Sequence, residues 1–518
     1  MRRPATGAWA ATRRRSRCDF LGITSILVTA LAACGGSDSA AEAMAADDDL
    51  TPIGAEAMAR LTGGSADYCA IPDHDVEVLA LRPSTAEAPV DDVNWFARPV
   101  PHDGEEWLVA FASHNQNYLY DLSNGRRIAI PDRSDAVATP DGRYMTVPSY
   151  YTPDSTVRFY PVEPMLDALD REEDVADLQP AFVQDDPAIA RVYCQSTALV
   201  SESAVDDRVE TTYRLMFSGT NHESRFRIAD YVFSHDVADG RLLGVTPSPP
   251  MAICPAVQND LNTPFISKDG RYVAAYTSDT AGNEYSSGSS LKIFEITSVD
   301  PGAGTTTCEV VVDLGFAAGK ADFSFDGSML TFHLSQGAYL TPFVNGGLPA
   351  GTITDIVVAR LERDDSGRIV GHSGLQRLST SLESGVGSYF PAFFPDGNLF
   401  YISNRVPRGS DEPSRFDFRV VDPSSRGWRP PPTTDGEMAL WAELGALWQH
   451  ACVPELPEGA SAEANPFPLA AHELPLHALS LSVPQCTALV EDARTDEGAG
   501  DRDWDALLGA CEAVAQKR

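Results

Sequence analysis

Lysine is nearly absent from this sequence, which contains only Lys268, Lys292, Lys320 and Lys517. The 518 residues include 39 Lys and Arg against 74 Asp and Glu, so the formal net charge is −35 at pH 7. Phosphate groups repel a chain with this charge, which argues against nucleic acid and anionic lipid headgroups as partners. The charge suits a cationic partner or bound divalent cations, but a well-solvated surface is the simpler interpretation.

Sequence motifs for common catalytic sites are also missing. The nearest approach to the Gly-x-Ser-x-Gly elbow of serine hydrolases is Gly371–Gly374, which has the wrong spacing. The zinc pattern His-Glu-x-x-His fails at His472, because His477 comes one residue late. An acidic run over 501–512 lacks the glycine of a calcium-binding loop. We therefore expect no catalytic residue, no metal ligand and no cofactor.

The N-terminus carries a charged and then an apolar segment. Six arginines in the first 17 residues precede an apolar run from Phe20 to Ala33. These 14 residues are too few to span a bilayer comfortably, so the run predicts a cleaved signal peptide. A short membrane anchor is the alternative interpretation.

The end of this run, Leu31-Ala32-Ala33-Cys34, resembles the lipobox of bacterial lipoproteins. The resemblance implies that residues 1–33 are removed and that Cys34 carries lipid, which would hold the protein at a membrane face. Gly35 follows Cys34, whereas Asp is the commonest signal for retention at the inner membrane. We therefore expect an exported protein that is anchored by lipid in the bacterial envelope. Of its membranes we favour the outer one.

A short segment built on an Asp-Gly pair recurs five times. The clearest copy is 391–405, PAFFPDGNLFYISNR, which predicts an inner strand, a tight turn and a second strand. In such a turn Asp accepts backbone N–H groups and Gly adopts a positive φ. Further alternating segments supply third and fourth strands, and four strands per repeated unit predict a β-propeller. The predicted turn residues are Asp103 and Gly104, Asp141 and Gly142, Asp269 and Gly270, Asp326 and Gly327, and Asp396 and Gly397.

The repeat resembles that of TolB-like propellers, in which a Ser-Pro-Asp-Gly turn precedes an apolar strand ending in Ser-Asp or Ser-Asn. The resemblance covers about 100–425 and implies the fold, but little about function, because such propellers occur in binding proteins and in peptidases. We count six blades, since 191–245 resembles a degenerate blade without its turn. There are seven if 68–95 forms part of another blade; these first strands can instead complete the last blade.

After a Pro-rich break at 426–436 the apolar period becomes helical. A capping box at Thr434–Glu437 predicts a first helix, and its inward face is Trp441, Leu444, Leu447, Trp448 and Cys452. Ser482 and Gln485 resemble a second cap that opens another helix, and the last helix spans about 503–516. The complete prediction is an all-β propeller with a small α-helical appendage. Its parts are a signal peptide over 1–33, a flexible tether over 34–67, the propeller over 68–428 and a helical region over 429–518.

Cysteine usage fits an exported protein. No Cys-x-x-Cys pair or zinc-like Cys and His spacing occurs, so disulfides or buried thiols are expected. The count after Cys34 is odd, which leaves at least one cysteine unpaired or bonded to another chain. We favour a disulfide between Cys486 and Cys511, because both lie on apolar faces of predicted helices. The seven cysteines are Cys69, Cys194, Cys254, Cys308, Cys452, Cys486 and Cys511.

These features favour a non-catalytic binding protein or scaffold of the cell envelope. By resemblance to TolB its partner would be an envelope protein or peptide, and its oligomeric state is left open. The alternative is a lyase or hydrolase acting on glycans or peptides from the central channel. Histidines that converge on that channel would support the alternative. If His114, His235 and His333 do not converge, we expect each to form hydrogen bonds that stabilise the fold.

Overall fold

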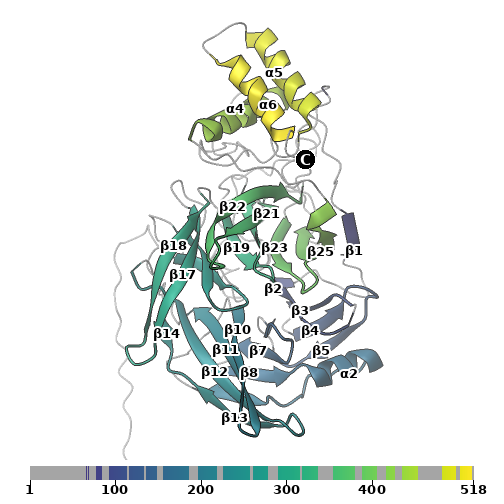
Figure 1. Ribbon diagram of the computed structural model, residues 1–518. Coiled ribbons are helices and arrows are strands. Elements are labelled where there is room, and N and C mark those ends of the chain that lie inside the picture. Colours follow the sequence, from purple (N-terminus) through teal and green to yellow (C-terminus); the bar gives the residue numbers. More distant parts are fainter. Residues whose placement is uncertain are drawn as a thin grey trace, which may run out of the picture.

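The chain folds mainly into β-sheets, with a group of helices at its C-terminal end (Figure 1). No helix in the described part of the chain combines the length and apolar character needed to span a bilayer. The computed structural model describes residues 66, 68, 77–83, 93–104, 106–113, 116–132, 136–148, 156–185, 196–218, 226–256, 261–277, 290–314, 318–335, 354–379, 388–404, 416–425, 435–452, 481–497 and 502–515.

Four sheets contain four antiparallel strands each, as expected for propeller blades. In three of them the chain runs from strand to neighbouring strand in sequence order. The first has β2 (Val93–Pro99), β3 (Leu108–Ser113), β4 (Gln116–Asp121) and β5 (Arg127–Ile130). The second has β6 (Val137–Ala138), β7 (Tyr144–Pro148), β8 (Thr156–Pro161) and β9 (Phe182–Asp185). The third has β19 (Ala318–Phe323), β20 (Met329–Ser335), β21 (Thr354–Arg363) and β22 (Ile369–Arg377).

The fourth four-stranded sheet joins the two ends of the β-region. Its first three strands are β23 (Ser388–Phe393), β24 (Leu399–Asn404) and β25 (Phe416–Asp422), followed by the short 3-10 helix η4 (Pro423–Ser425). The fourth is the earliest strand among the described residues, β1 (Glu77–Pro83), which pairs antiparallel with β25. The sheet that ends the repeat is thus completed by the strand that begins it.

A nine-stranded sheet lies between the second and third blades in sequence. It contains two antiparallel runs joined by β14 (Met251–Ala252), which pairs with β12 on one side and parallel with β18 on the other. The first run is β10 (Ser196–Val205), β11 (Arg208–Ser218), β12 (Phe226–Asp236) and β13 (Leu242–Pro247). The second is β15 (Leu261–Ile266), β16 (Tyr272–Thr277), β17 (Ser290–Asp300) and β18 (Thr305–Asp313).

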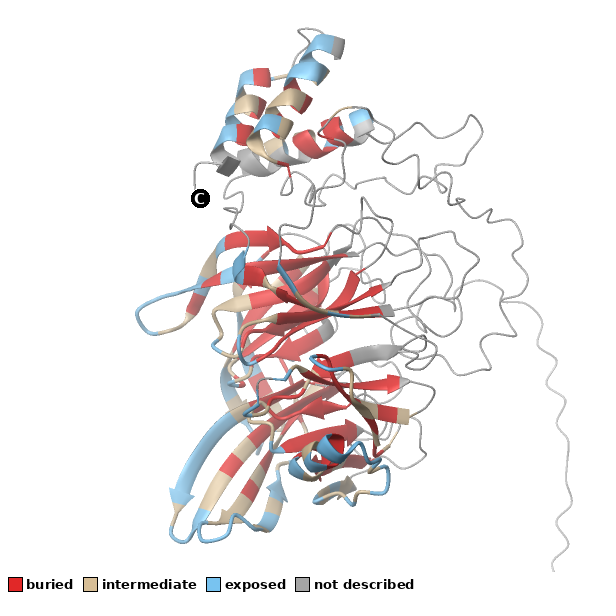
Figure 2. Cartoon of the chain, turned by 90° about the vertical axis from the view of Figure 1, so that its right-hand side faces the viewer, coloured by how far each residue is buried: buried red, intermediate tan, exposed pale blue. Residues whose placement is uncertain are grey.

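The first strand of each run contacts the first strand of the next, so these strands form a closed ring. Around the ring β2 contacts β6, β6 contacts β10, β10 contacts β15, β15 contacts β19, β19 contacts β23, and β23 contacts β2. Every residue of β19 and of β23 is buried. Buried residues fill the strand interiors, and the exposed residues lie mostly at the outer hairpins (Figure 2).

One helix within the β-region was not predicted. α2 (Glu163–Arg171) follows β8 and buries Met165, Ala168 and Leu169 against the first two blades. Its local sequence carried the signal, since Pro164 stands in the first turn and the three apolar residues recur at helical spacing. α2 therefore adds a helix to the region that was predicted to be rich in strands.

The C-terminal region forms α4 (Asp435–Cys452), α5 (Val483–Glu497) and α6 (Trp504–Ala515), which lie together beyond one side of the sheets (Figure 1). Ser482 and Gln485 form the predicted cap of α5, because the Ser482 amide donates to Gln485 Oε1 at 3.0 Å. Cys486 and Cys511 are joined by a disulfide between α5 and α6. This is the pair that the sequence favoured.

Candidate functional site

The Asp-Gly turns are structural corners of the sheets. In four of them the Asp carboxylate accepts the amide two residues later, and the glycine has a positive φ between 67° and 87°. In three, a Thr or Ser hydroxyl two residues before the Asp also donates to it. Phe394 holds this place in the fourth and cannot. These turns are centred on Asp141, Asp269, Asp326 and Asp396.

The fifth predicted turn, at Asp103 and Gly104, is built differently. The Gly104 amide donates to His102 Nδ1 at 2.7 Å, and the other nitrogen of the same ring lies 2.7 Å from the Glu106 carbonyl. Gly104 is not among the glycines with a positive φ. The imidazole of His102 therefore closes this turn where an Asp carboxylate closes the others.

Two turn carboxylates also join neighbouring sheets. The Tyr213 hydroxyl on β11 donates to Asp141 Oδ2 at 2.6 Å. The Trp107 indole donates to Asp396 Oδ2 at 2.9 Å and so connects the first blade with the last. These carboxylates accept hydrogen bonds from fixed donors, which explains their presence without a catalytic role.

A buried arginine on one inner strand extends across the middle of the ring. Arg98 on β2 is 5 % exposed, and its guanidinium carbon lies 4.7 Å from the ring centroid of Phe265 on β15. Arg98 also donates to the carbonyl of Pro391 on β23 at 3.4 Å. Because β2 is flanked by β6 and β23, and β15 by β10 and β19, the Arg98 side chain crosses the ring centre.

A second buried cation lies on the next inner strand, β19. Lys320 has a φ of 51° and is 3 % exposed, with its Nζ 6.0 Å from the centroid of Phe390 on β23. His333 on β20 contacts the same aromatic ring, with centroids 5.9 Å apart. Burial, assisted by the Lys320 charge, lowers the pKa of His333 to about 3. The His333 imidazole is therefore neutral at physiological pH.

A buried carboxylate on β19 connects this strand with residues on or beside the neighbouring inner strands. Asp322 on β19 accepts Lys268 Nζ at 2.8 Å and the amide of Phe393 at 3.0 Å. Lys268 also lies 5.1 Å from the ring centroid of Phe325. Two of the four lysines thus lie on or beside inner strands of a strongly acidic chain. We call the surroundings of five residues the ring centre: Arg98, Phe265, Lys320, Phe390 and His333. The ring centre is the candidate site.

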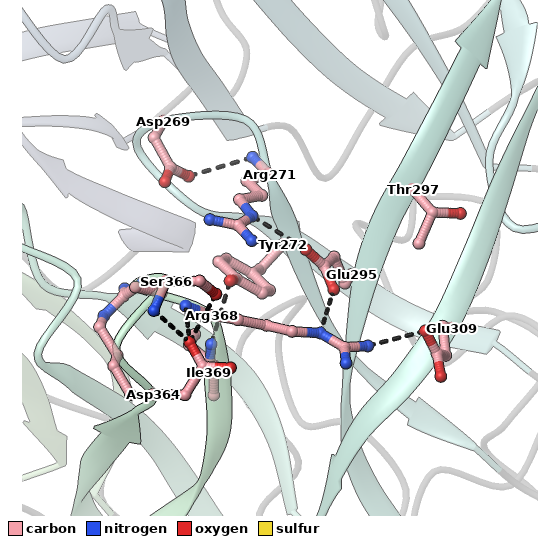
Figure 3. Close-up of polar contacts among 12 residues, drawn as sticks. Asp269, Arg271, Tyr272, Glu295, Thr297, Glu309, Asp364, Ser366, Arg368 and Ile369 are labelled. Carbon is pink, nitrogen blue, oxygen red and sulfur yellow. Dashed lines mark hydrogen bonds and ion pairs between the residues drawn. The ribbon is translucent and has the colours of Figure 1, made fainter.

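An ion-pair ladder joins the nine-stranded sheet to the sheet of β19–β22 (Figure 3). Glu295 on β17 accepts Arg271 Nε at 2.9 Å and Arg368 Nε at 2.6 Å. Arg368 also donates to Glu309 on β18 at 2.7 Å. Burial would raise the pKa of Glu295, but hydrogen bonds from the two guanidinium groups outweigh it and hold the pKa below 4.5. Both oxygens are engaged, so the ladder locks the sheets together.

Of the histidines named from the sequence, the two that the structure describes lie on different sheets. His235 on β12 lies 2.7 Å from the Tyr144 hydroxyl, at the contact between the second blade and the nine-stranded sheet. Burial lowers the pKa of His235 and raises that of Tyr144 to about 12, so both are neutral at pH 7. His333 lies on a different sheet, and His114 is outside the described residues.

The remaining predicted sites concern metals and lipid. Within the described ranges no group of three or more His, Cys, Asp or Glu is placed to hold a metal ion. Cys34, His472 and His477 lie outside those ranges, and so does the predicted tether except for residue 66. Asp503, from the acidic run, accepts the amide of Ala506 at 3.0 Å and so caps α6.

Sequence reasoning did not single out Arg98, Lys320 or the pair Cys254 and Cys308. The two cysteines form a disulfide across the β14 junction, and the Cys254 amide donates to Thr306 Oγ1 at 2.9 Å. The scarcity of lysine was the one sequence signal for Lys320. Nothing local marked the cysteine pair, because its members are 54 residues apart.

The closed ring of inner strands defines the chain as a β-propeller. No family model and no curated sequence matches it. Among solved structures it is similar to a putative TolB from Agrobacterium tumefaciens, with 13% identity over 66% of this chain and 97% of that one, at a TM-score of 0.32. TolB from Acinetobacter baumannii matches with 12% identity over 69% and 66%, at 0.26. The propeller domain of Cps50 (Swd1) from Myceliophteria thermophila matches with 9% identity over 65% and 98%, at 0.30. Because these TM-scores are low, we assign the fold from the strand pairing and not from these similarities.

Proposed function

We propose that this chain is a lipid-anchored, extracytoplasmic β-propeller that binds an envelope protein or peptide and does not catalyse a reaction. The observation that carries the proposal is the contact between Arg98 and Phe265, which places side chains of opposite inner strands against each other at the ring centre. A channel enzyme needs open space and a titratable group poised near neutral pH. Here His333 is buried and neutral, which supports binding on the outer surface instead.

We further propose that the propeller has six blades, with the nine-stranded sheet counted as two. Its two runs, β10–β13 and β15–β18, each begin with a strand that belongs to the ring of inner strands. In support, β1, the described strand before the first blade, completes the last blade instead of beginning another one.

The proposed binding surface is the outer half of β10–β13. β11 and β12 each have 11 residues against six in β19 or β23. The hairpins protrude and are largely exposed (Figure 2). Two apolar side chains lie open on them, with Val237 59 % and Leu243 48 % exposed. Exposed apolar groups on a protruding edge suit a protein or peptide partner.

A photo-crosslinking amino acid at position 243 in intact cells tests this surface. We expect one discrete protein adduct, which disappears when Val237→Asp is added beside the probe. The ring-centre variant His333→Gln serves as the matched control and should leave the adduct unchanged. Two results would support the channel enzyme instead. One is loss of the adduct in the control alone, and the other is turnover of a glycan or peptide that His333→Gln abolishes.

Lipid attachment is tested separately at Cys34. With labelled palmitate in the growth medium, the full chain should acquire label and sediment with the outer-membrane fraction. Cys34→Ser should lose both properties, because no other residue in the Leu-Ala-Ala-Cys segment can be acylated. Cys69→Ser provides the control and should behave as the wild type. An unlabelled wild-type chain would exclude the anchor without bearing on the binding surface.

A further inference from the structure

The C-terminal helices hold a residue from the other end of the described chain. The Trp448 indole of α4 donates to the backbone carbonyl of Tyr68 at 2.9 Å, in a buried setting. The Tyr68 hydroxyl donates to Asp492 Oδ2 of α5, also at 2.9 Å. Tyr68 is thus held by its main chain through one helix and by its side chain through another.

Apolar contacts reinforce these hydrogen bonds. Tyr68 is 7 % exposed and belongs to the same buried cluster as Leu447, Leu489 and Val490, and Ala66 packs against that cluster. The disulfide between Cys486 and Cys511 ties α5 to α6, so α5 is held in place before Tyr68 docks. A preformed surface lowers the conformational entropy lost when a segment docks on it.

The position of Tyr68 in the sequence gives this contact its meaning. Tyr68 comes 34 residues after Cys34 and nine residues before Glu77, the first residue of β1. Nine residues span at most about 30 Å and 34 residues at most about 120 Å. Any chain that runs from a lipid on Cys34 to the ring must therefore pass through the helices first.

We propose that α4, α5 and α6 form a clasp for the end of the tether, so that the lipid anchor acts on the helices and keeps them between the membrane and the ring. This inference rests on the proposed lipid attachment for the membrane, but the clasp itself does not. The clasp gives the helical region a role: it orients the propeller, with the protruding hairpins of β10–β13 left for the partner.

The first arm of the test uses the mature chain with Cys34→Ser, which needs no membrane. Chymotrypsin cleaves after tyrosine, and the buried carbonyl of Tyr68 should protect the bond to Cys69. Trp448→Phe removes the indole donor and should speed cleavage at this bond about fivefold to tenfold, the effect of one hydrogen bond of about 1 kcal/mol. Trp504→Phe is the matched control, because the Trp504 indole nitrogen has no hydrogen-bond partner among the residues that the structure describes.

The second arm uses the acylated full chain in vesicles that contain a quenching lipid. A fluorophore at Thr495, which is exposed on α5, should be quenched more strongly than one at Val237 in the outer hairpin of β12 and β13. Trp448→Phe should reduce this difference, and Trp504→Phe should not.

The two arms separate the ways in which the inference can fail. Rapid cleavage after Tyr68 in the unaltered chain, or equal cleavage in the two tryptophan variants, overturns the clasp whatever the state of Cys34. Protection without vesicle binding leaves the clasp standing and refutes the lipid anchor. Protection with stronger quenching at Val237 refutes the proposed orientation.

Discussion

Arg98 and Phe265 lie in contact across the propeller, with the guanidinium carbon 4.7 Å from the centroid of the aromatic ring. Arg98 comes from the first blade and Phe265 from the second run of the nine-stranded sheet. Such a contact holds only while every intervening inner strand is in place. It therefore reports on closure of the ring as a whole.

Replacing Arg98 with alanine should destabilise the protein by about 2 kcal/mol, because a desolvated cation–π contact and the hydrogen bond to Pro391 are both lost. Urea unfolding followed by tryptophan fluorescence measures the change in midpoint. Arg241→Ala serves as the control, since Arg241 is 70% exposed in its side chain and should shift stability by no more than about 0.5 kcal/mol. Equal effects of the two substitutions would show that Arg98 does not brace the ring.

Replacing Glu295 with glutamine should cost about 2 kcal/mol at pH 7, because two arginines lose their shared carboxylate. The folded-state pKa lies below 4.5, so this contribution is fully present above pH 4.5 and disappears as the pH falls through the lowered value. Unfolding curves of the wild type and variant should therefore converge in acid. Glu309→Gln is the control, because that side chain is 61% exposed and should change stability by about 0–1 kcal/mol.

Stability should also depend on His333. Its pKa is lowered from 6.5 to about 3, so between these values the unfolded chain binds a proton that the folded chain does not. Stability contributed by the neutral imidazole is full above pH 6.5 and falls as the pH is lowered. His333→Gln should flatten this part of the pH profile of the unfolding midpoint. An unchanged slope would indicate that His333 is charged in the folded protein.

Removing the disulfide at the β14 junction should lower stability by about 2–4 kcal/mol, because it closes a long loop in the unfolded chain. The test is the double variant Cys254→Ser and Cys308→Ser, compared with the wild type in oxidising and reducing buffer. The double variant should resemble the reduced wild type at this junction. Cys486→Ser with Cys511→Ser is the control, which should loosen the helices and leave hydrogen exchange in β14 and β18 unchanged.

Sequence patterns predicted the sheet corners well, because an Asp-Gly turn depends on residues only a few positions apart. Asp141, Asp269, Asp326 and Asp396 each accept the amide two residues later, as their local chemistry requires. The copy at Asp103 deviated, since its turn is closed by the Gly104 amide donating to the His102 ring. Local chemistry also placed the cap at Ser482 and the helix that follows it.

The ring centre could not be predicted, since it depends on strands that are distant in sequence. Arg98 and Phe265 are separated by 167 positions in the chain, and no periodicity reveals which strands will lie opposite each other. The same reason hid the disulfide of Cys254 and Cys308 and the docking of Tyr68 on α4. Each joins segments whose proximity follows only from the closed ring or from the helices.

The sequence by itself determined the repeated pattern of four strands, the acidic charge and the expectation of a lipid-bearing N-terminus, because each depends on composition or short-range spacing. Only the tertiary structure decided that β1 completes the last blade, that two runs share one nine-stranded sheet, and that Tyr68 contacts the C-terminal helices. Each of these contacts pairs a strand edge or a polar group with a segment far away in the sequence, and such long-range matching is not encoded in any local segment.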